Sequence, residues 1–227
     1  RGVAASLVSP PIAAGCTMQT SSPLEALQAR ALKGALVVLF LDAMCVFLGL
    51  SVLAYFLEDL GGSPLALGSL FATFAAFNIV ASAWTGVASD KFGRRPVLIA
   101  STCGVTIGFL LTGTAQSVPW LFVARAWLGF WSGVGSVGRA YIADVTSPAK
   151  RTDAMGRAGA VMMVGYSVGA PLGGMLALLG SYRVPFFVGA AASLGGAAYV
   201  WTFLPSPAAV QELMREDSAM KEESAMK

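Results

Sequence analysis

Two ionisable side chains, Asp42 and Arg125, lie inside long apolar stretches of the sequence. A charge at membrane depth costs a few kcal/mol or more unless it faces a partner or water, so such residues are functional candidates by default. Asp42 is the only acid within any of these stretches, and we predict that it binds and releases a proton. For Arg125 the alternative is a side chain that extends to the outer interface near Trp120.

Small residues follow Asp42 on the same side of a predicted helix. Cys45 and Gly49 come three and seven positions later, close to one and two turns of an α-helix. A strip of small residues is suited to lining a cavity. We therefore predict that Asp42, Cys45 and Gly49 face a common cavity.

A short charged segment, Gly86-Val-Ala-Ser-Asp-Lys-Phe-Gly-Arg-Arg95, separates two apolar stretches. It cannot lie in hydrocarbon, so it must mark one membrane face. Its parts have separable roles: a small residue allows close helix approach, glycine permits a turn, and an acid one helical turn before an arginine can pair with it. The candidate hinge residues are Gly86, Asp90, Lys91, Gly93, Arg94 and Arg95.

Transmembrane helices must position these residues. Hydrophobic residues make up 56% of the 227-residue chain and charged residues only 12%, about half the charge of a soluble domain, and the mean hydropathy is +0.71. A bilayer core needs roughly 20 apolar residues per helix. Six stretches meet this length, and they predict an all-α membrane protein with a bundle of six transmembrane helices at residues 34–57, 65–88, 97–115, 119–141, 157–179 and 185–204.

The distribution of Lys and Arg predicts the orientation, because translocated loops carry few of them. In a six-span arrangement nearly all lie on one side, and only Arg183 lies in a loop on the other. Both termini and the hinge should then be cytoplasmic, or on the equivalent face of an organelle. The predicted parts are a disordered tail, 1–33, a bundle, 34–204, and a cytoplasmic tail or central loop, 205–227, in which Asp-Ser-Ala-Met-Lys recurs as Glu-Ser-Ala-Met-Lys. A transit-segment remnant is the alternative for residues 1–24.

Several function classes are excluded by composition. The chain has no histidine and three cysteines without paired spacing, which removes His-ligated zinc and serine–histidine hydrolysis. We find no catalytic constellation, and we expect neither enzyme activity nor a cofactor or metal. The net charge of +3 does not imply nucleic acid, since the cations gather at one membrane face.

The hinge pattern Gly-x-x-x-Asp-Lys-x-Gly-Arg-Arg, between two spans, resembles the hinge between spans 2 and 3 of the major facilitator superfamily of secondary transporters. The resemblance implies that Arg94 pairs with an acid at the end of span 4, and Asp144 stands at that position. It also implies that Asp90 faces the N-terminal end of span 11. The likeness covers about residues 30–207, which corresponds to the N-terminal six-span half of a twelve-helix transporter.

The first span is similar to that of tetracycline and multidrug/proton antiporters, in which Phe-Leu-Asp opens the segment, although Ser51 and Ala54 stand where those proteins tend to have prolines. The resemblance implies proton coupling through Asp42 and Arg125. It also implies that Asn78 faces the substrate, and we predict a substrate-binding set of Asn78, Cys45, Gly49 and Gly129. The alternative for Asn78 is a hydrogen bond that bridges two helices.

The fifth apolar stretch contains a run of small residues that resembles the antiporter motif of the superfamily. In the family this groove packs against span 8 of the other half, and it favours antiport over symport. Ala170 stands where members usually carry proline. The predicted groove residues are Gly165, Gly169, Pro171, Gly173 and Gly174.

Two hypotheses from different classes follow. In the first, the chain is half of a proton-coupled exporter of small organic molecules, with a missing C-terminal half or a second chain as its partner; a symporter of the same superfamily is the variant of this hypothesis. In the second, it is a six-span structural or interaction subunit that binds a partner, or a second copy of itself, through the surfaces of spans 2 and 5.

Overall fold

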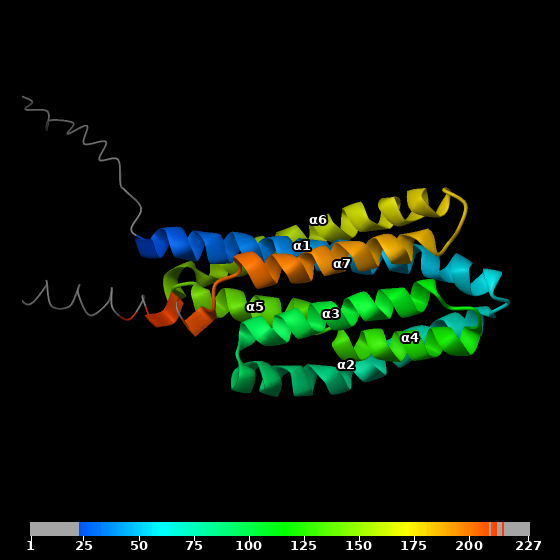
Figure 1. Cartoon of the computed structure of the whole chain (residues 1–227), viewed down its shortest axis with the longest axis horizontal. Coiled ribbons are helices and arrows are strands. Elements are labelled where there is room, and N and C mark those ends of the chain that lie inside the picture. The colour runs from blue at the N-terminus through cyan, green and yellow to red at the C-terminus, as the bar shows by residue number, and fades with distance from the viewer. Residues whose placement is uncertain (1–22, 209, 213–214, 216–227) are drawn as a thin grey trace, which may run out of the picture.

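The computed structural model describes residues 23–208, 210–212 and 215, which form helices joined by short connections (Figure 1). Successive passes run in opposite directions along one bundle, so the predicted all-α bundle is confirmed. Five helices of this part are long and apolar enough to cross a membrane, namely α1, α2, α3, α6 and α7. The bounds are α1 Pro23–Asp59, α2 Pro64–Phe92, α3 Arg94–Gly113, α4 Val118–Trp131, α5 Val134–Val145, the 3₁₀-helix η1 Pro148–Lys150, α6 Arg151–Ala177 and α7 Val184–Phe203.

The predicted fourth span, 119–141, is two helices instead of one. α4 ends at Trp131 and α5 begins at Val134, and together they make one pass through the bundle (Figure 1). Gly133 at the break has a lower helix propensity than the apolar residues on either side. Gly133 also permits a close approach, since a Cβ there would lie 2.7 Å from the Thr85 methyl group of α2.

The first helix begins earlier than predicted. α1 starts at Pro23, so residues 23–33, expected to belong to a disordered tail, are helical instead. Proline is favoured in a first helical turn, and the buried residues Ala31 and Ala35 extend the packed face of the helix. The length of an apolar stretch predicts only the part of a helix that lies in hydrocarbon, not a polar extension beyond it. Residues 1–22 and the repeated pentapeptides at 217–227 lie outside the described residues.

The segment after α7 returns to the bundle. Tyr141 of α5 donates a hydrogen bond from its hydroxyl to the carbonyl of Pro205, at 2.8 Å. Val210 is completely buried and belongs to the hydrophobic core. The first residues of the predicted cytoplasmic tail therefore pack against the bundle.

α6 lies against α1 through three glycines. A Cβ at Gly165 would lie 2.8 Å from a backbone carbonyl oxygen of α1, and a Cβ at Gly169 or Gly173 would meet the next carbonyls of that face more closely still. The α1 carbonyls belong to Phe40, Met44 and Leu48. The prediction that these three glycines form a groove for another half is therefore wrong, because α1 of the same chain already fills it.

The remaining groove residues lie elsewhere on α6. Pro171 and Gly174 are exposed, and a Cβ at Gly174 would meet nothing within 4 Å. Small residues every four positions show that a close contact exists, but not which helix makes it.

One end of the bundle gathers most of the cations. It holds the start of α1, the α2–α3 hinge, the α5–α6 connection and the end of α7 (Figure 1), and we call it the hinge end. Arg183 precedes α7 at the opposite end. The alternation of passes thus places the cations as the six-span interpretation requires.

Candidate functional site

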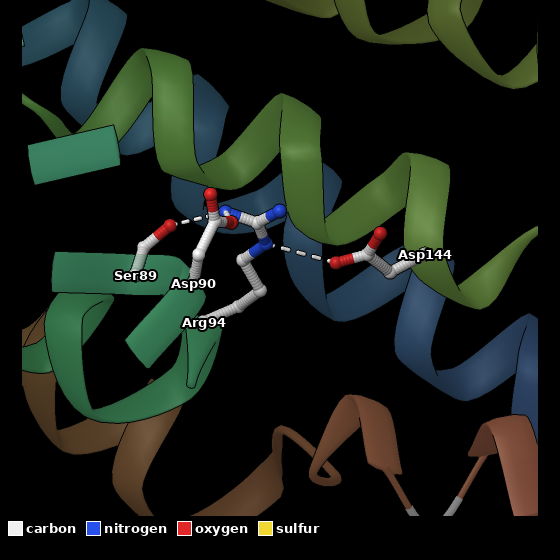
Figure 2. Close-up of polar contacts among 4 residues, drawn as sticks. All are labelled: Ser89, Asp90, Arg94 and Asp144. Carbon is white, nitrogen blue, oxygen red and sulfur yellow. Dashed lines mark hydrogen bonds and ion pairs between the residues drawn. The ribbon is translucent and has the colours of Figure 1, made fainter. Parts of the chain in front are cut away.

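At the hinge end, Arg94 connects three segments of the chain (Figure 2). Its Nε donates to Oδ2 of Asp144 at 2.9 Å, and its Nη1 lies 2.7 Å from Oδ1 of Asp90 and also donates to the hydroxyl of Ser89. Gly93, directly before it, has a φ of +94°, a conformation that glycine adopts without strain. The turn at Gly93 therefore starts α3 so that Arg94 reaches both α2 and α5.

The two acids beside Arg94 differ in exposure. The side chain of Asp144 is 29% exposed and that of Asp90 68%, against 22% for Arg94. Water screens an exposed pair and weakens it. The contact with Asp144 therefore contributes more to holding α3 against α5 than the contact with Asp90 contributes to the turn.

The other hinge residues have distinct surroundings. Arg95 donates from Nη2 to the carbonyl of Trp201 at 2.5 Å, which ties the hinge to the last turn of α7. Lys91 is exposed, with Nζ 5.7 Å from the centre of the Phe92 ring. A Cβ at Gly86 would meet nothing within 4 Å, so the expected close helix approach at this glycine is not found among the described residues. Ser89, which the sequence reasoning did not include, is a further partner of Arg94.

A cavity of about 450 Å³ lies between the helices. It brings together four of the residues singled out from the sequence: Asp42, Gly49, Asn78 and Arg125. Its volume is in the range of small-molecule sites. Among the described residues, no group of three His, Cys, Asp or Glu could hold a metal ion.

Arg125 is buried and unpaired. Its residue is 7% exposed, and its Nε has no hydrogen-bond partner in the described part of the chain. Every ion pair found there involves other residues, those of Arg94 and the pair Arg157–Asp153, so neither Arg125 nor Asp42 is neutralised by a direct partner. The guanidinium lines the cavity and does not extend to the outer interface, where Trp120 donates to the carbonyl of Leu111 instead.

Asn78 bridges two helices as well as lining the cavity. Its Nδ2 donates to the hydroxyl of Ser132, at the break between α4 and α5. Ser132 in turn donates to the carbonyl of Gly129 at 2.9 Å. The amide thus makes the interhelical hydrogen bond that was the alternative interpretation, while it also lies at the cavity wall.

Cys45 and Gly129 lie outside the cavity lining, contrary to expectation. Cys45 is 1% exposed and its thiol donates to the carbonyl of Gly189 in α7, at 3.6 Å. At about 100° per residue, position +3 is turned by about 60° from Asp42, whereas position +7, Gly49, is turned by only about 20°. Gly129 packs against α2 instead, since a Cβ there would clash with the carbonyl of Phe74.

Arg139 was not singled out from the sequence, yet it lines the same cavity. It is exposed, and within the described part of the chain its Nε donates only to the carbonyl of Gly135 on its own helix, at 3.2 Å. The cost of an intramembrane charge, which singled out Arg125, applies to it as well. Aromatic rings cover much of the remaining wall, contributed by Phe71, Phe74, Phe109 and Tyr166.

Comparison with known proteins identifies the family. Residues 35–224 match the Major Facilitator Superfamily. The chain belongs to this superfamily, whose members are transporters rather than enzymes. It is an integral, multi-pass membrane protein.

Several relatives are resistance proteins. The chain is 34% identical over 161 residues to the class B tetracycline resistance protein of Escherichia coli, covering 70% of this chain and 40% of that protein. It is 27% identical over 200 residues to multidrug resistance protein 2 of Bacillus subtilis (strain 168), covering 86% of this chain and 50% of that protein. The chain thus spans half or less of the length of these relatives and corresponds to their N-terminal half.

A solved structure supports the fold. The chain resembles the crystal structure of the human organic anion transporter MFSD10 (TETRAN) with a TM-score of 0.68 and 24% sequence identity. The match covers 79% of this chain and 48% of that one. The described bundle is therefore part of a major facilitator fold.

Proposed function

We propose that the chain is the N-terminal half of a secondary active transporter, and that a small organic solute passes through the cavity with proton coupling. The observation that carries the proposal is the presence of Asp42 and Arg125 on one cavity inside a six-pass bundle. The resistance proteins among its relatives favour export in exchange for protons. A symporter of the same superfamily is the alternative.

Asp42 would carry the proton in this scheme. It lines the cavity with no ion-pair partner among the described residues, so its carboxylate is available to a proton that enters from the cavity. Arg125 lines the same cavity and would modulate this step through its charge. Asn78 and Gly49 would contact the solute.

The hinge would act as a gate at one membrane face. Arg94 joins the end of α2, the start of α3 and the end of α5, so separation of these helix ends requires that its contacts break. The excess of cations at this end favours a cytoplasmic location. The extensively exposed faces of α2 and α6 would receive the completing half of the transporter.

Transport by the complete protein in proteoliposomes tests the proposal. A pH gradient should drive movement of tetracycline or a fluorescent multidrug substrate, and Asp42→Asn should abolish that movement because the amide cannot take up the proton. Asp59→Asn is the matched control, since Asp59 is an exposed acid at the end of α1, outside the cavity. Transport that survives Asp42→Asn with its pH dependence intact would exclude Asp42 as the proton carrier.

A further inference from the structure

We infer that the solute is an organic anion, and that its negative group binds between Arg125, Arg139 and the N-terminus of α5. The inference rests on the proposed transport function, because it concerns the same cavity. It assigns a substrate class that the sequence motifs leave open.

The first support is the charge of the cavity wall. Among the described residues its charged side chains are Asp42, Arg125 and Arg139, so positive charge exceeds negative charge by one when all three are ionised. Neither arginine forms an ion pair with a described residue. A buried guanidinium nitrogen without a partner, as at Arg125, is uncommon in folded proteins and needs an explanation. An anion from the cavity would supply the partner.

The second support is the break between α4 and α5. Residues of the first turn of α5, Gly135 and Ser136, line the cavity together with Gly133. Among the described residues, no side chain caps this 12-residue helix. The first turn of α5, at the positive end of the helix dipole, therefore borders the cavity. Such half-helix N-termini bind anionic groups of substrates in secondary transporters.

The third support is the chemistry of the rest of the wall. Phe71, Phe74, Phe109 and Tyr166 offer apolar and aromatic surface to the body of a ligand. A guanidinium fork matches a planar group with two oxygens, such as a carboxylate. The geometry therefore fits a small aromatic or apolar monocarboxylate.

The same charges bear on proton coupling. Asp42 lines the same cavity as Arg125 from α4, Arg139 from α5 and Tyr166 from α6. Its negative charge, when ionised, disfavours an anion in the same cavity, so the two compete electrostatically. A proton on Asp42 removes this competition, so proton and anion should bind cooperatively.

Binding to the complete transporter in detergent tests the inference without any proton gradient. The probes are 1-naphthoate and its uncharged counterpart 1-naphthamide, each measured by equilibrium dialysis with naphthalene fluorescence. We expect 1-naphthoate to bind about tenfold more tightly or better, because its carboxylate gains charge-assisted hydrogen bonds. Asp42→Asn, which mimics the protonated acid, should tighten 1-naphthoate binding several-fold.

Arg139→Gln is the decisive variant, because Arg139 is exposed and its replacement leaves the core intact, whereas Arg125 is buried. It should weaken 1-naphthoate binding about tenfold and leave 1-naphthamide binding unchanged. The matched control is Arg151→Gln, at an exposed arginine outside the cavity, which should change neither. The inference is overturned if 1-naphthoate binds no more tightly than 1-naphthamide, or if neither compound binds. It is also overturned if Arg139→Gln leaves the ratio of their two dissociation constants unchanged. Loss of proton-driven transport with anion-selective binding intact would instead refute only the proposed function.

Discussion

Two glycines of the same helix should respond in opposite ways to an added methyl group. Gly169 of α6 lies against the carbonyl of Met44 in α1, so the Cβ of Gly169→Ala would clash with backbone that cannot rotate away. Gly174 lies five residues further along α6, on the exposed face, where a Cβ meets nothing within 4 Å. Gly174→Ala is therefore the matched control for the change in helix propensity.

The expected magnitudes follow from two terms. Overpacking by one methyl group in a close contact costs about 1–3 kcal/mol, while replacing glycine by alanine in a helix contributes up to about 1 kcal/mol of stability at either position. Gly169→Ala should then lower the free energy of unfolding by about 0–3 kcal/mol, and Gly174→Ala should leave it unchanged or raise it by up to about 1 kcal/mol. Because the propensity term is common to both, their difference of about 1–3 kcal/mol reports the α1–α6 contact.

Unfolding of the purified chain by sodium dodecyl sulfate in mixed micelles, followed by far-ultraviolet circular dichroism, measures both values. Loss of helicity for Gly169→Ala should occur at a lower fraction of the denaturing detergent than for Gly174→Ala. If Gly174→Ala is destabilised as much as Gly169→Ala, or more, the glycine face of α6 does not pack on α1.

Three further predictions concern the hinge and the cavity wall. Double-mutant cycles should give a coupling energy of about 1–3 kcal/mol between Arg94 and Asp144, but of only about 0.3–0.5 kcal/mol between Arg94 and the exposed Asp90. Equal coupling energies would show that the lower exposure of Asp144 does not strengthen its contact with Arg94. Asn78→Ala and Ser132→Ala should each cost about 1 kcal/mol of unfolding free energy and be non-additive in the double variant, since they share one hydrogen bond. In a Cys16→Ser background, mass spectrometry after N-ethylmaleimide treatment should find Cys103 modified well before the buried Cys45; rapid modification of Cys45 with protection by solute would place it in the cavity after all.

The number and order of passes could be predicted from the sequence because each pass must contain a stretch of apolar residues that spans the bilayer. The mean hydropathy of a stretch of about 20 residues hardly changes with one or two of them, so the break at Ser132 and Gly133 was not predicted. Its signal was present as a serine followed by a glycine, but such pairs also occur in continuous membrane helices. Gly133 at the break packs closely against Thr85 on another helix, and a contact between helices cannot be read from the local sequence.

For the site residues too, local contacts could be predicted from the sequence, whereas contacts between distant segments could not. Pairing of Arg94 with Asp90 is local and could be read from a spacing of four, whereas the contact with Asp144 was suggested only by resemblance to a family pattern. Cys45 was misplaced because helical spacing gives a direction and not a neighbour: a rotation of about 60° from Asp42 is enough to turn the thiol to α7. The motif glycines of α6 likewise specified a close contact without specifying its partner.

The two candidate sites are joined by a single short helix. The first turn of α5 and Arg139 line the cavity, and Asp144 near its last residue holds Arg94 at the hinge end. Twelve residues of α-helix span about 18 Å and transmit a displacement along their axis with little compression. A solute that draws the N-terminus of α5 towards its negative group therefore acts on the Arg94–Asp144 contact.

By thermodynamic linkage the reverse also holds, so weakening this contact by Asp144→Asn should change solute affinity in the cavity. Unchanged 1-naphthoate binding in that variant would show that the cavity and the hinge are independent.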